Sequence, residues 1–394
     1  MHKEKDSRIF AAWEGRLVWY SRFDPDGEGG GGGCRREAQL RLALAPLNPH
    51  VESSRRAPVI TGELSRPRRW RWNLEKRHHP FQRYWADDRV FHWTMGMHYT
   101  ARQWAGELRR RGVPRLAVVT DPLFFAPLVL RLTKAGVPVA ALCQNLESLG
   151  YEQLNPRFQR RLLNRELDLL SRCRLLVTIS REEQFLLRNL NLPAVHFPYY
   201  PVPGEAARLT AIRTRRRRSR KTHFLLLGTA GNKSTRAGMR AVITAWKRIP
   251  YRNRRLEKLF VAGYWTRLLG DDLDGDGVEI LGEIPDDRLD KLLTSVRAAL
   301  VYQKHGGGAL TRVADMLLAG VPVLANEHAL RNWYGLSGTR SFTGIDDLLH
   351  GALNLAAGIP PPVPPGQIQP PDARALLEHF QKLMAADSIK GGRR

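Results

Sequence analysis

Cysteine is scarce in this chain of 394 residues, which contains three, at positions 34, 143 and 173. An odd number of widely separated cysteines fits neither a disulfide framework nor a zinc site, so we expect reduced thiols. No apolar run approaches the roughly 18–20 residues that a membrane-spanning helix needs. The first twenty residues also lack the apolar core and the cleavage site of a signal peptide. These absences predict a cytoplasmic protein.

Acidic side chains are also few, with 38 aspartates and glutamates against 63 lysines and arginines, for a net charge of +25. Clustered cations attract phosphate, in nucleic acid or in an anionic membrane surface, but they can also form a solvated surface. Tryptophans interleave with the first cluster, as in single-strand binders and membrane-interface segments. Charge alone does not distinguish nucleic-acid binding from membrane binding or from a solvated surface. The clusters lie at 66–72, 75–79, 107–112 and 213–221.

From residue 99 onward, apolar strand-like segments alternate with amphipathic helical segments, which is typical of parallel sheets covered by helices on both faces. The proline-rich "HFPYYPVPGE" and the basic run after it interrupt the alternation, as a linker would. We predict an α/β protein with two Rossmann-like domains that face each other across a cleft. The predicted parts are the domains 1–198 and 222–371, the linker 199–221, and a final helix and tail at 372–394.

Individual segments carry this pattern. Strands are predicted at 16–23, 115–120, 138–145, 174–180, 257–263, 278–284 and 298–303, with another beginning at 222. Helices are predicted from near Arg35 and at 99–112, 127–136, 155–173, 181–190, 236–249, 285–296 and 373–387. Ser180 is a good cap for the helix that follows it, because its hydroxyl can accept from free N–H groups of the first turn. The glycine-rich 24–34 and the basic 52–80 are predicted to be loops.

Three consecutive glycines at 306–308 follow a predicted strand and precede an amphipathic helical run. Ligands of parallel α/β domains bind at the carboxyl ends of strands. Glycines let backbone N–H groups approach closely and a helix N-terminus adds partial positive charge, so a diphosphate is a natural ligand. Arg312 could bind its phosphates, and Asp315, on the same helical face, could accept from ribose hydroxyls. The alternative is a structural turn followed by a surface ion pair.

A second loop is predicted at the same edge of this sheet. Gly228 ends the first strand of the second domain, and Lys233 and Arg236 come before the next helix. Together with Arg312, these cations would suit a nucleoside diphosphate, although either of them could simply be solvated.

Residues 272–283 match the calcium-loop pattern D-x-D-x-D-G-x5-E. A calcium-binding EF-hand has a helix on both sides and an apolar eighth position, which is Glu279 here. Because "VEILGEI" has the pattern of a strand, we expect an acidic loop and no metal site.

The segment "HGGGALTRVADMLLAGVPVLAN" resembles the donor site of retaining GT-B glycosyltransferases of the GT4 type, also called glycosyltransferase group 1. Gly306 and Gly308 match the turn of that family, Arg312 its basic position and Asp315 its acidic position, and Gly320 and Pro322 match the end of the block. "GTAGNKSTRAG" is similar to the family's phosphate loop, and "RLLVTISREEQFL" to a segment of its N-terminal domain. The resemblance spans roughly residues 100–340. It implies a GT-B fold whose C-terminal helix crosses back to the N-terminal domain.

The resemblance also implies an activity. A sugar would pass from a UDP- or GDP-linked donor in the C-terminal domain to a glycan or lipid-linked acceptor on the N-terminal domain, with retention and with neither metal nor cofactor. Catalytic roles fall to Arg312, Asp315 and Lys233. Donor contacts fall to Gly228, Arg236, Gly306, Gly307, Gly308 and Thr311. Asn145, Glu147 and His98 are candidates for acceptor or sugar contacts.

Three other functions stay open, one of which is another enzyme that acts on a phosphoryl group or a nucleotide sugar. The family usually has a first carboxylate eight positions before the acidic residue, and that position is Gly307 here. A non-catalytic binding protein of the same fold is therefore an alternative. A nucleic-acid binder is the third, but the clusters are scattered and no helix-turn-helix, RRM or zinc motif is present. We expect no nucleic-acid partner, and peripheral association with the inner face of a membrane through the basic clusters.

Overall fold

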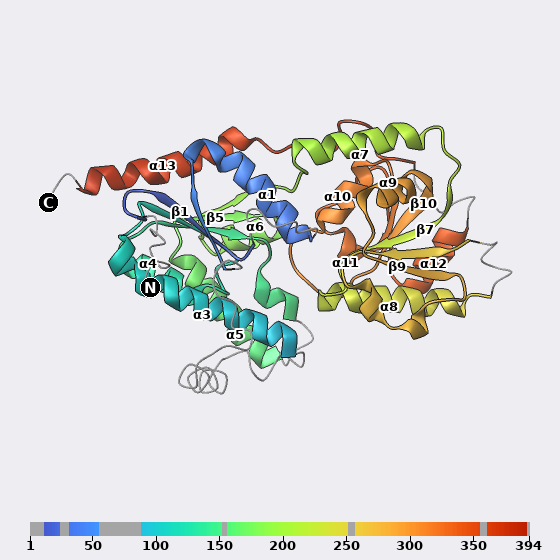
Figure 1. The fold of residues 1–394 in the computed structure, drawn as a ribbon, viewed down its shortest axis with the longest axis horizontal. Helices are drawn as coiled ribbons and strands as arrows, with labels where there is room; N and C mark the ends of the chain where they lie inside the picture. Colours follow the sequence, from blue (N-terminus) through green and yellow to red (C-terminus); the bar gives the residue numbers. More distant parts are fainter. Residues whose placement is uncertain are drawn as a thin grey trace, which may run out of the picture.

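The computed structural model describes residues 12–23, 31–54, 88–151, 156–250, 257–354 and 361–391. These residues form two parallel sheets of six strands each, with helices packed on both faces (Figure 1). The first sheet uses strands between residues 17 and 196, and the second uses strands between residues 222 and 342. The predicted α/β architecture of two Rossmann-like domains is confirmed.

The N-terminal sheet has the order β2-β1-β3-β4-β5-β6, and every neighbouring pair is parallel. Its central strands are apolar and buried along their whole length, because helices cover both faces. The strands are β1 (Leu17–Ser21), β2 (His50–Ser53), β3 (Leu116–Thr120), β4 (Val139–Cys143), β5 (Leu175–Thr178) and β6 (Ala194–His196). The helices are α1 (Gly32–Leu44), α3 (Asp88–Arg111), α4 (Ala126–Lys134), α5 (Pro156–Ser171) and α6 (Arg181–Asn189), with short 3-10 turns η1 (Ala45–Leu47) and η2 (Glu147–Tyr151).

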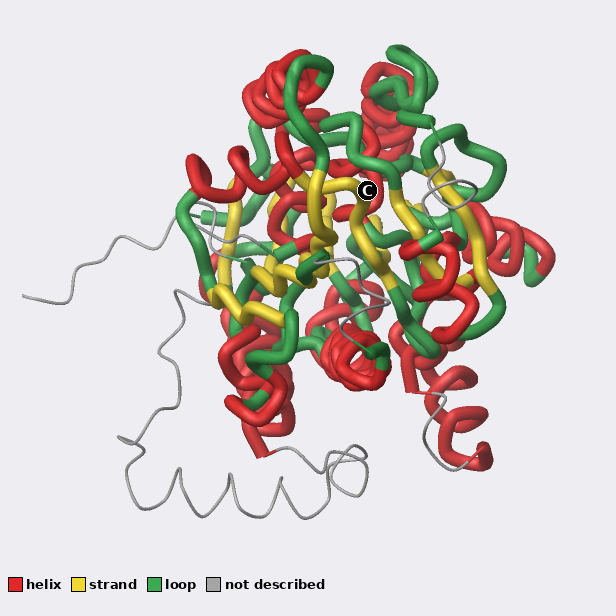
Figure 2. The backbone as a smooth tube through the Cα atoms, turned by 90° about the vertical axis from the view of Figure 1, so that its right-hand side faces the viewer, coloured by secondary structure: helices red, strands yellow, loops and turns green. Residues whose placement is uncertain are grey.

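The C-terminal sheet has the order β12-β11-β10-β7-β8-β9 and is also parallel. Helices flank its strands on both sides in the view of Figure 2. The strands are β7 (Thr222–Leu227), β8 (Leu259–Ala262), β9 (Val278–Gly282), β10 (Val296–Val301), β11 (Val323–Asn326) and β12 (Thr339–Phe342). The helices are α7 (Pro203–Arg216), α8 (Lys233–Arg248), α9 (Asp286–Ser295), α10 (Thr311–Leu318), α11 (Glu327–Leu330) and α12 (Ile345–Leu353), with 3-10 turns η4 (Thr266–Leu269) and η5 (Asp271–Leu273).

The last helix, α13 (Ala373–Gly391), packs on the N-terminal domain beside α1 (Figure 1). Leu376 and Phe380 are buried in the same apolar cluster as Trp19 of β1. Arg115, just before β3, donates from Nη2 to the carbonyl oxygen of Met384 at 2.9 Å. The predicted crossing of the C-terminal helix back to the first domain is confirmed.

Some local predictions were wrong. The segment predicted as a linker is largely helix α7, whose Leu209 and Ile212 are buried in the core of the C-terminal domain. Proline at the first turn favours a helix, and arginine has a high helix propensity, so the prolines and charges there form a helix. Strand β2 enters the predicted loop 52–80, and α3 begins at Asp88, before the predicted start.

Other predictions are confirmed or lie outside the described residues. Ser180 caps α6 through its hydroxyl, which accepts from the Glu183 amide. Strand β9 occupies the second half of the calcium-like pattern, as its apolar residues predicted. The basic clusters at 66–72 and 75–79 and most of the loop 24–34 fall outside the described residues. None of the helices in the described ranges combines the length and apolar character needed to cross a membrane.

Candidate functional site

The three consecutive glycines lie in the loop that leaves the carboxyl end of β10, where Gly307 and Gly308 touch the N-terminal domain. A Cβ on Gly308 would lie 2.5 Å from the carbonyl oxygen of Gln144 and still nearer to Oδ1 of Asn145, directly after β4. Gly308 also has φ of +66°, which disfavours other residues. A Cβ on Gly307 would lie 2.8 Å from Oε1 of Glu183. Glycine is needed here for contact between the two domains as well as for any approach of a ligand.

Hydrogen bonds hold this glycine loop in one position. The Gly308 amide donates to Oε1 of Glu183 on α6 at 2.8 Å, and the Leu146 amide donates to the same oxygen at 3.0 Å. Arg331 donates to the carbonyl oxygens of Gly307 and Gly308. The amide of Gly308, predicted to contact phosphate, is therefore engaged by a carboxylate in this structure.

Burial raises the pKa of Glu183 to about 7, although the amides of Leu146 and Gly308 favour its charged form. Its second oxygen, Oε2, is buried and has no hydrogen-bond partner among the described residues. Sequence reasoning assigned Glu183 no role. It lies in "RLLVTISREEQFL", the segment whose similarity to the family could have drawn attention to it.

Arg312 lies in the first turn of α10 and meets the loop after β7. A Cβ on Gly228 would lie 3.3 Å from its Nη1. The Nε of Arg312 is buried and has no hydrogen-bond partner among the described residues. Burial, and then the charge of Arg331, lower the pKa of Arg312 to about 10. The structure thus brings two predicted donor-site residues together, Gly228 and the half-buried cation Arg312.

The N-terminus of α8 lies against the same region. Asn232 caps the helix, its Oδ1 accepting from the Thr235 amide at 3.0 Å, and Lys233 is the first helical residue. A Cβ on Gly306 would lie 3.8 Å from Oγ of Ser234, which places the glycine loop beside this helix terminus. Lys233 and Arg236 are both half-buried. The two loops predicted to hold a diphosphate are therefore neighbours.

Asp315 contacts the N-terminal domain. Its carboxylate is buried, with Arg35 Nη1 2.5 Å from Oδ2 and the Tyr199 hydroxyl donating to Oδ1 at 3.1 Å. Burial raises the pKa of Asp315 to about 6, and the charge of Arg35 opposes this rise. The predicted alternative of an Arg312–Asp315 surface ion pair is wrong, because Asp315 is buried and pairs with Arg35, whereas the half-buried Arg312 lies against Gly228. Thr311 is also buried at this junction, since a Cβ on Gly32 of α1 would lie 2.6 Å from its Oγ1.

On the N-terminal domain, two of the three candidates for acceptor or sugar contacts lie together. Asn145 Nδ2 donates to Oε1 of Glu147 at 3.2 Å. Burial, followed by the charge of Asp121, raises the pKa of Glu147 to about 8. His98 is a half-buried residue of α3, the helix that packs against α4.

Asp121 is a residue of this region that sequence reasoning missed. It directly follows β3 with φ of +49°, accepts from the Gln144 amide at 3.2 Å and pairs with Arg22 Nε at 2.9 Å. The sequence could have indicated Asp121, because it is a polar residue directly after a predicted strand and is followed by Pro122. Asn145 was chosen on the same ground, as a polar residue at the end of a strand. The polar groups after β4 thus lie against the glycine loop of the other domain, and Asp121 at the end of β3 holds the Gln144 amide beside them.

Comparison with known proteins supports the fold. No family model matches the sequence, and no curated protein matches it. Among solved structures, sucrose-phosphate synthase from Thermosynechococcus elongatus is 16% identical, with a TM-score of 0.56 over 96% of this chain and 98% of that one. The trehalose-6-phosphate protein from E. coli, bound with UDP-2-fluoro glucose, is 12% identical, with a TM-score of 0.54 over 94% and 95%.

A third similar structure is Anabaena HepE in complex with UDP and glucose. It is 12% identical, with a TM-score of 0.57 over 94% of this chain and all of that one. At these identities the likeness concerns the fold. The chain has the GT-B fold of these glycosyltransferases, with two Rossmann-like domains and a C-terminal helix that returns to the first.

Proposed function

We propose that this protein is a glycosyltransferase that takes a sugar from a nucleoside diphosphate donor, linked to UDP or GDP. The donor diphosphate lies between the glycine loop, the N-terminus of α8 and Arg312. The acceptor, a lipid-linked or polysaccharide glycan, lies on the N-terminal side near Asn145 and Glu147. Transfer proceeds with retention and without a metal.

The guanidinium of the half-buried Arg312, whose Nε atom is buried, carries this proposal. A charge taken out of water is costly unless a partner of opposite sign compensates it, and Nε of Arg312 lacks a partner among the described residues. The neighbouring groups are Gly228 and the N-terminus of α8, which carries partial positive charge of its own. A diphosphate at this point would satisfy both. In the similar structures of the E. coli protein and HepE, the bound molecules include UDP or a UDP-sugar.

The chemistry follows from where charge develops. When the sugar leaves, negative charge builds up on the diphosphate, and Arg312 with Lys233 or Arg236 stabilises it in place of a metal. The departing phosphate oxygen accepts the proton of the acceptor hydroxyl, so that no separate base is required. Asp315 accepts from the ribose in addition to its bonds with Arg35 and Tyr199, because a carboxylate has about four acceptor positions.

A second candidate function is nucleotide-sugar binding without transfer. Gly307 occupies the position of the family's first carboxylate, and both oxygens of Asp315 already have protein partners. The two candidates share the donor site and differ in turnover.

The experiment is a thermal shift against UDP, GDP, ADP and their sugars, on the wild type and on Arg312→Met. A nucleotide at about 100 times its dissociation constant stabilises the protein by about 2.7 kcal/mol. We expect a shift with one base, lost in Arg312→Met and kept in Arg288→Met, which removes the same charge from an exposed position on α9. No shift with any nucleotide would contradict the donor site.

Turnover then separates the two functions. Release of the nucleotide diphosphate is measured with the donor identified above and a panel of lipid-linked and polysaccharide acceptors. Binding without acceptor-dependent release would favour the binding protein.

Peripheral membrane association is part of the proposal. Not every basic residue is free for it, since Arg111 of the 107–112 cluster is buried and pairs with Glu52 and Glu107. In the 213–221 cluster, Arg218 and Arg220 are exposed. We expect co-sedimentation with anionic vesicles that weakens as salt rises, with no comparable affinity for DNA. Binding to DNA but not to vesicles would favour the nucleic-acid reading.

A further inference from the structure

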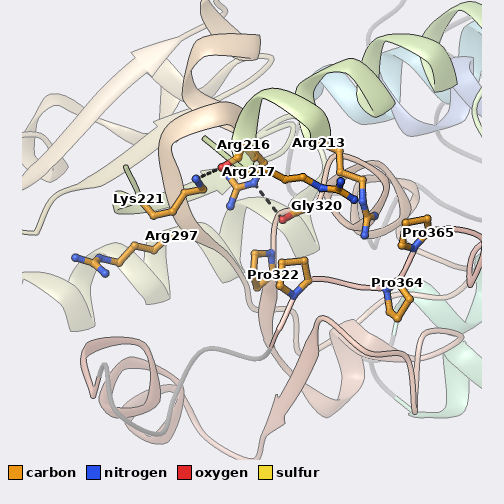
Figure 3. Close-up of a pocket in the computed structure, with 10 residues that line it drawn as sticks. Arg213, Arg216, Arg217, Lys221, Arg297, Gly320, Pro322, Pro364 and Pro365 are labelled. Carbon is orange, nitrogen blue, oxygen red and sulfur yellow. Dashed lines mark hydrogen bonds between the residues drawn. The ribbon is translucent and has the colours of Figure 1, made fainter. Parts of the chain in front are cut away.

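A pocket of about 480 Å³ lies in the C-terminal domain, between the end of α7 and the segments that lead into β10 and β11 (Figure 3). No aspartate or glutamate lines it among the described residues. Its basic lining residues are Arg213, Arg216, Arg217, Lys221 and Arg297. The cluster at 213–221, conspicuous in the sequence, therefore forms one wall of a concave site as well as an exposed surface.

The pocket is separate from the proposed donor site. Arg297 is at the amino end of β10, whereas the glycine loop follows the carboxyl end of the same strand. A strand of six residues spans about 20 Å. The two sites therefore lie at opposite edges of the sheet, and one small molecule does not fill both.

Neutral groups hold the two innermost arginines in place. Arg213 donates to the carbonyl oxygens of Leu317 and Val363. Arg216 is buried and donates from Nε to the carbonyl oxygen of Gly320 at 3.0 Å. Backbone carbonyls fix the direction of a guanidinium without cancelling its charge.

The other cations are also left largely uncompensated. Lys221 donates to the carbonyl oxygens of Arg216 and Ser219, and Arg217 is exposed at the rim. Of the five basic lining residues, Arg297 alone pairs with a carboxylate in the described part of the chain, with its Nε 2.7 Å from Glu257. Four positive charges thus share the pocket without an acidic partner.

The helix end alone does not account for this concentration of charge. The C-terminus of a helix carries about half a negative charge, which favours one cation rather than four. Burial lowers the pKa of Arg216 to about 10. Burial and the charge of Arg217 lower the pKa of Arg213, and burial and the charge of Arg216 lower that of Lys221. The cations repel one another, and a bound anion would relieve that repulsion.

The remaining wall indicates what kind of anion fits. It is formed by prolines, an apolar surface without donors. They are Pro322, Pro362, Pro364 and Pro365. The volume lies within the range of about 300–1,000 Å³ that is usual for small-molecule sites, and it exceeds what a lone phosphate ion fills. We propose that the pocket binds an organic phosphate, with its phosphate against the arginines and its organic part against the prolines.

Two variants with the same charge change test this proposal. Arg217 lines the pocket, whereas the neighbouring Arg218 is exposed and does not. Calorimetric titration with glucose 1-phosphate is expected to show binding to the wild type. Arg217→Glu should weaken it about tenfold or more, and Arg218→Glu should change it by less than about threefold. Equal losses in both variants, or a wild type that binds neither glucose 1-phosphate nor the phosphatidic acid vesicles of the next experiment, would overturn the proposal.

A vesicle arm identifies the source of the phosphate. Phosphatidic acid presents the same phosphomonoester on a lipid, so co-sedimentation is measured with vesicles that contain it. Both variants remove a charge from the exposed basic cluster, so a vesicle loss that is clearly larger in Arg217→Glu than in Arg218→Glu, without an effect on glucose 1-phosphate, assigns the pocket to a lipid headgroup. A loss with glucose 1-phosphate alone assigns the pocket to a soluble metabolite. Both results support an organic phosphate. Lys221→Gln is a second pocket variant in case Arg217→Glu fails to fold, which its melting curve would reveal.

The pocket and the donor site are tested independently. Arg217→Glu should keep the thermal shift with nucleotide, and Arg312→Met should keep the binding of glucose 1-phosphate at the pocket. If the pocket binds no organic phosphate, the proposed glycosyltransferase function is unaffected. If the donor site binds no nucleotide, the pocket proposal is unaffected.

Discussion

Arg35 on α1 and Asp315 on α10 form an ion pair between the two domains, with 2.5 Å between Nη1 and Oδ2. The two residues are 280 positions apart in the chain. Asp315 lies one helical turn from Arg312, so this pair ties the N-terminal domain to the helix that carries the proposed phosphate contact. The relative position of the domains and the geometry of the donor site are thereby linked.

We expect Asp315→Asn to reduce the free energy of unfolding by about 1–3 kcal/mol, because Arg35 and Tyr199 would lose the charge that they share. Urea denaturation measures the change. The control is Asp286→Asn, which weakens a longer contact of 3.8 Å to Arg208 at an exposed site, where less than about 1 kcal/mol is expected. Equal effects of the two substitutions would mean that the interdomain pair contributes no more to the free energy of unfolding than an exposed ion pair does.

Gly308→Ala tests the contact between the glycine loop and the end of β4. The added methyl group would overlap the carbonyl oxygen of Gln144, and the positive φ adds strain. Gly335→Ala is a matched control, since φ there is +73° and a Cβ would meet nothing within 4 Å. We expect about 1 kcal/mol of destabilisation in the control and clearly more in Gly308→Ala, measured by urea denaturation. Similar losses would show that the loop has room to move away from β4.

Glu183 should make stability depend on pH. Its pKa in the folded protein is about 7 against an ordinary 4.5, so the fold favours the protonated form. This contribution to stability is complete below about pH 4.5 and is lost as pH rises through about 7. Glu183→Gln cannot titrate but keeps an oxygen to accept from the Gly308 amide.

The free energy of unfolding of Glu183→Gln should therefore rise relative to that of the wild type between about pH 5 and about pH 8. The difference in free energy of unfolding between variant and wild type should change by at most about 1.4 kcal/mol per pH unit. Denaturation curves across this range measure it. The same substitution at the exposed Glu182 is the control for loss of a carboxylate from this helix. A constant difference between Glu183→Gln and the wild type at every pH would contradict the titration of Glu183.

Arg312→Met should stabilise the protein in the absence of nucleotide. It replaces a half-buried cation, whose buried Nε has no hydrogen-bond partner among the described residues, with an apolar side chain of similar length, and we expect a gain of about 1 kcal/mol. The same change should abolish the thermal shift with nucleotide. A loss of stability without ligand would show that the guanidinium already has compensation in the free protein.

Much of the fold was predictable from the sequence, because the signals are local. Apolar runs such as 116–120 and 139–143 are long enough and apolar enough to be strands buried on both faces, and the helices between them have amphipathic spacing. The glycines at 306–308 and the cap at Ser180 are also local signals. Helix α7 was predicted as a linker, since its prolines and arginines have the composition of one, and its packing against α9 and α10 depends on residues far away in the chain.

The candidate site was predictable only in part. The sequence by itself determined that Gly228, Arg312 and the glycine loop would follow strands of one parallel sheet, because parallel strands end at a common edge. Only the tertiary structure decided that Glu183 would receive the Gly308 amide, that Arg35 would pair with Asp315, and that five cations and four prolines would enclose a second pocket. These contacts join residues whose separation in the chain carries no periodic pattern. The first two form when the two domains pack together, and the pocket forms when α7 and the proline segment pack on the C-terminal sheet.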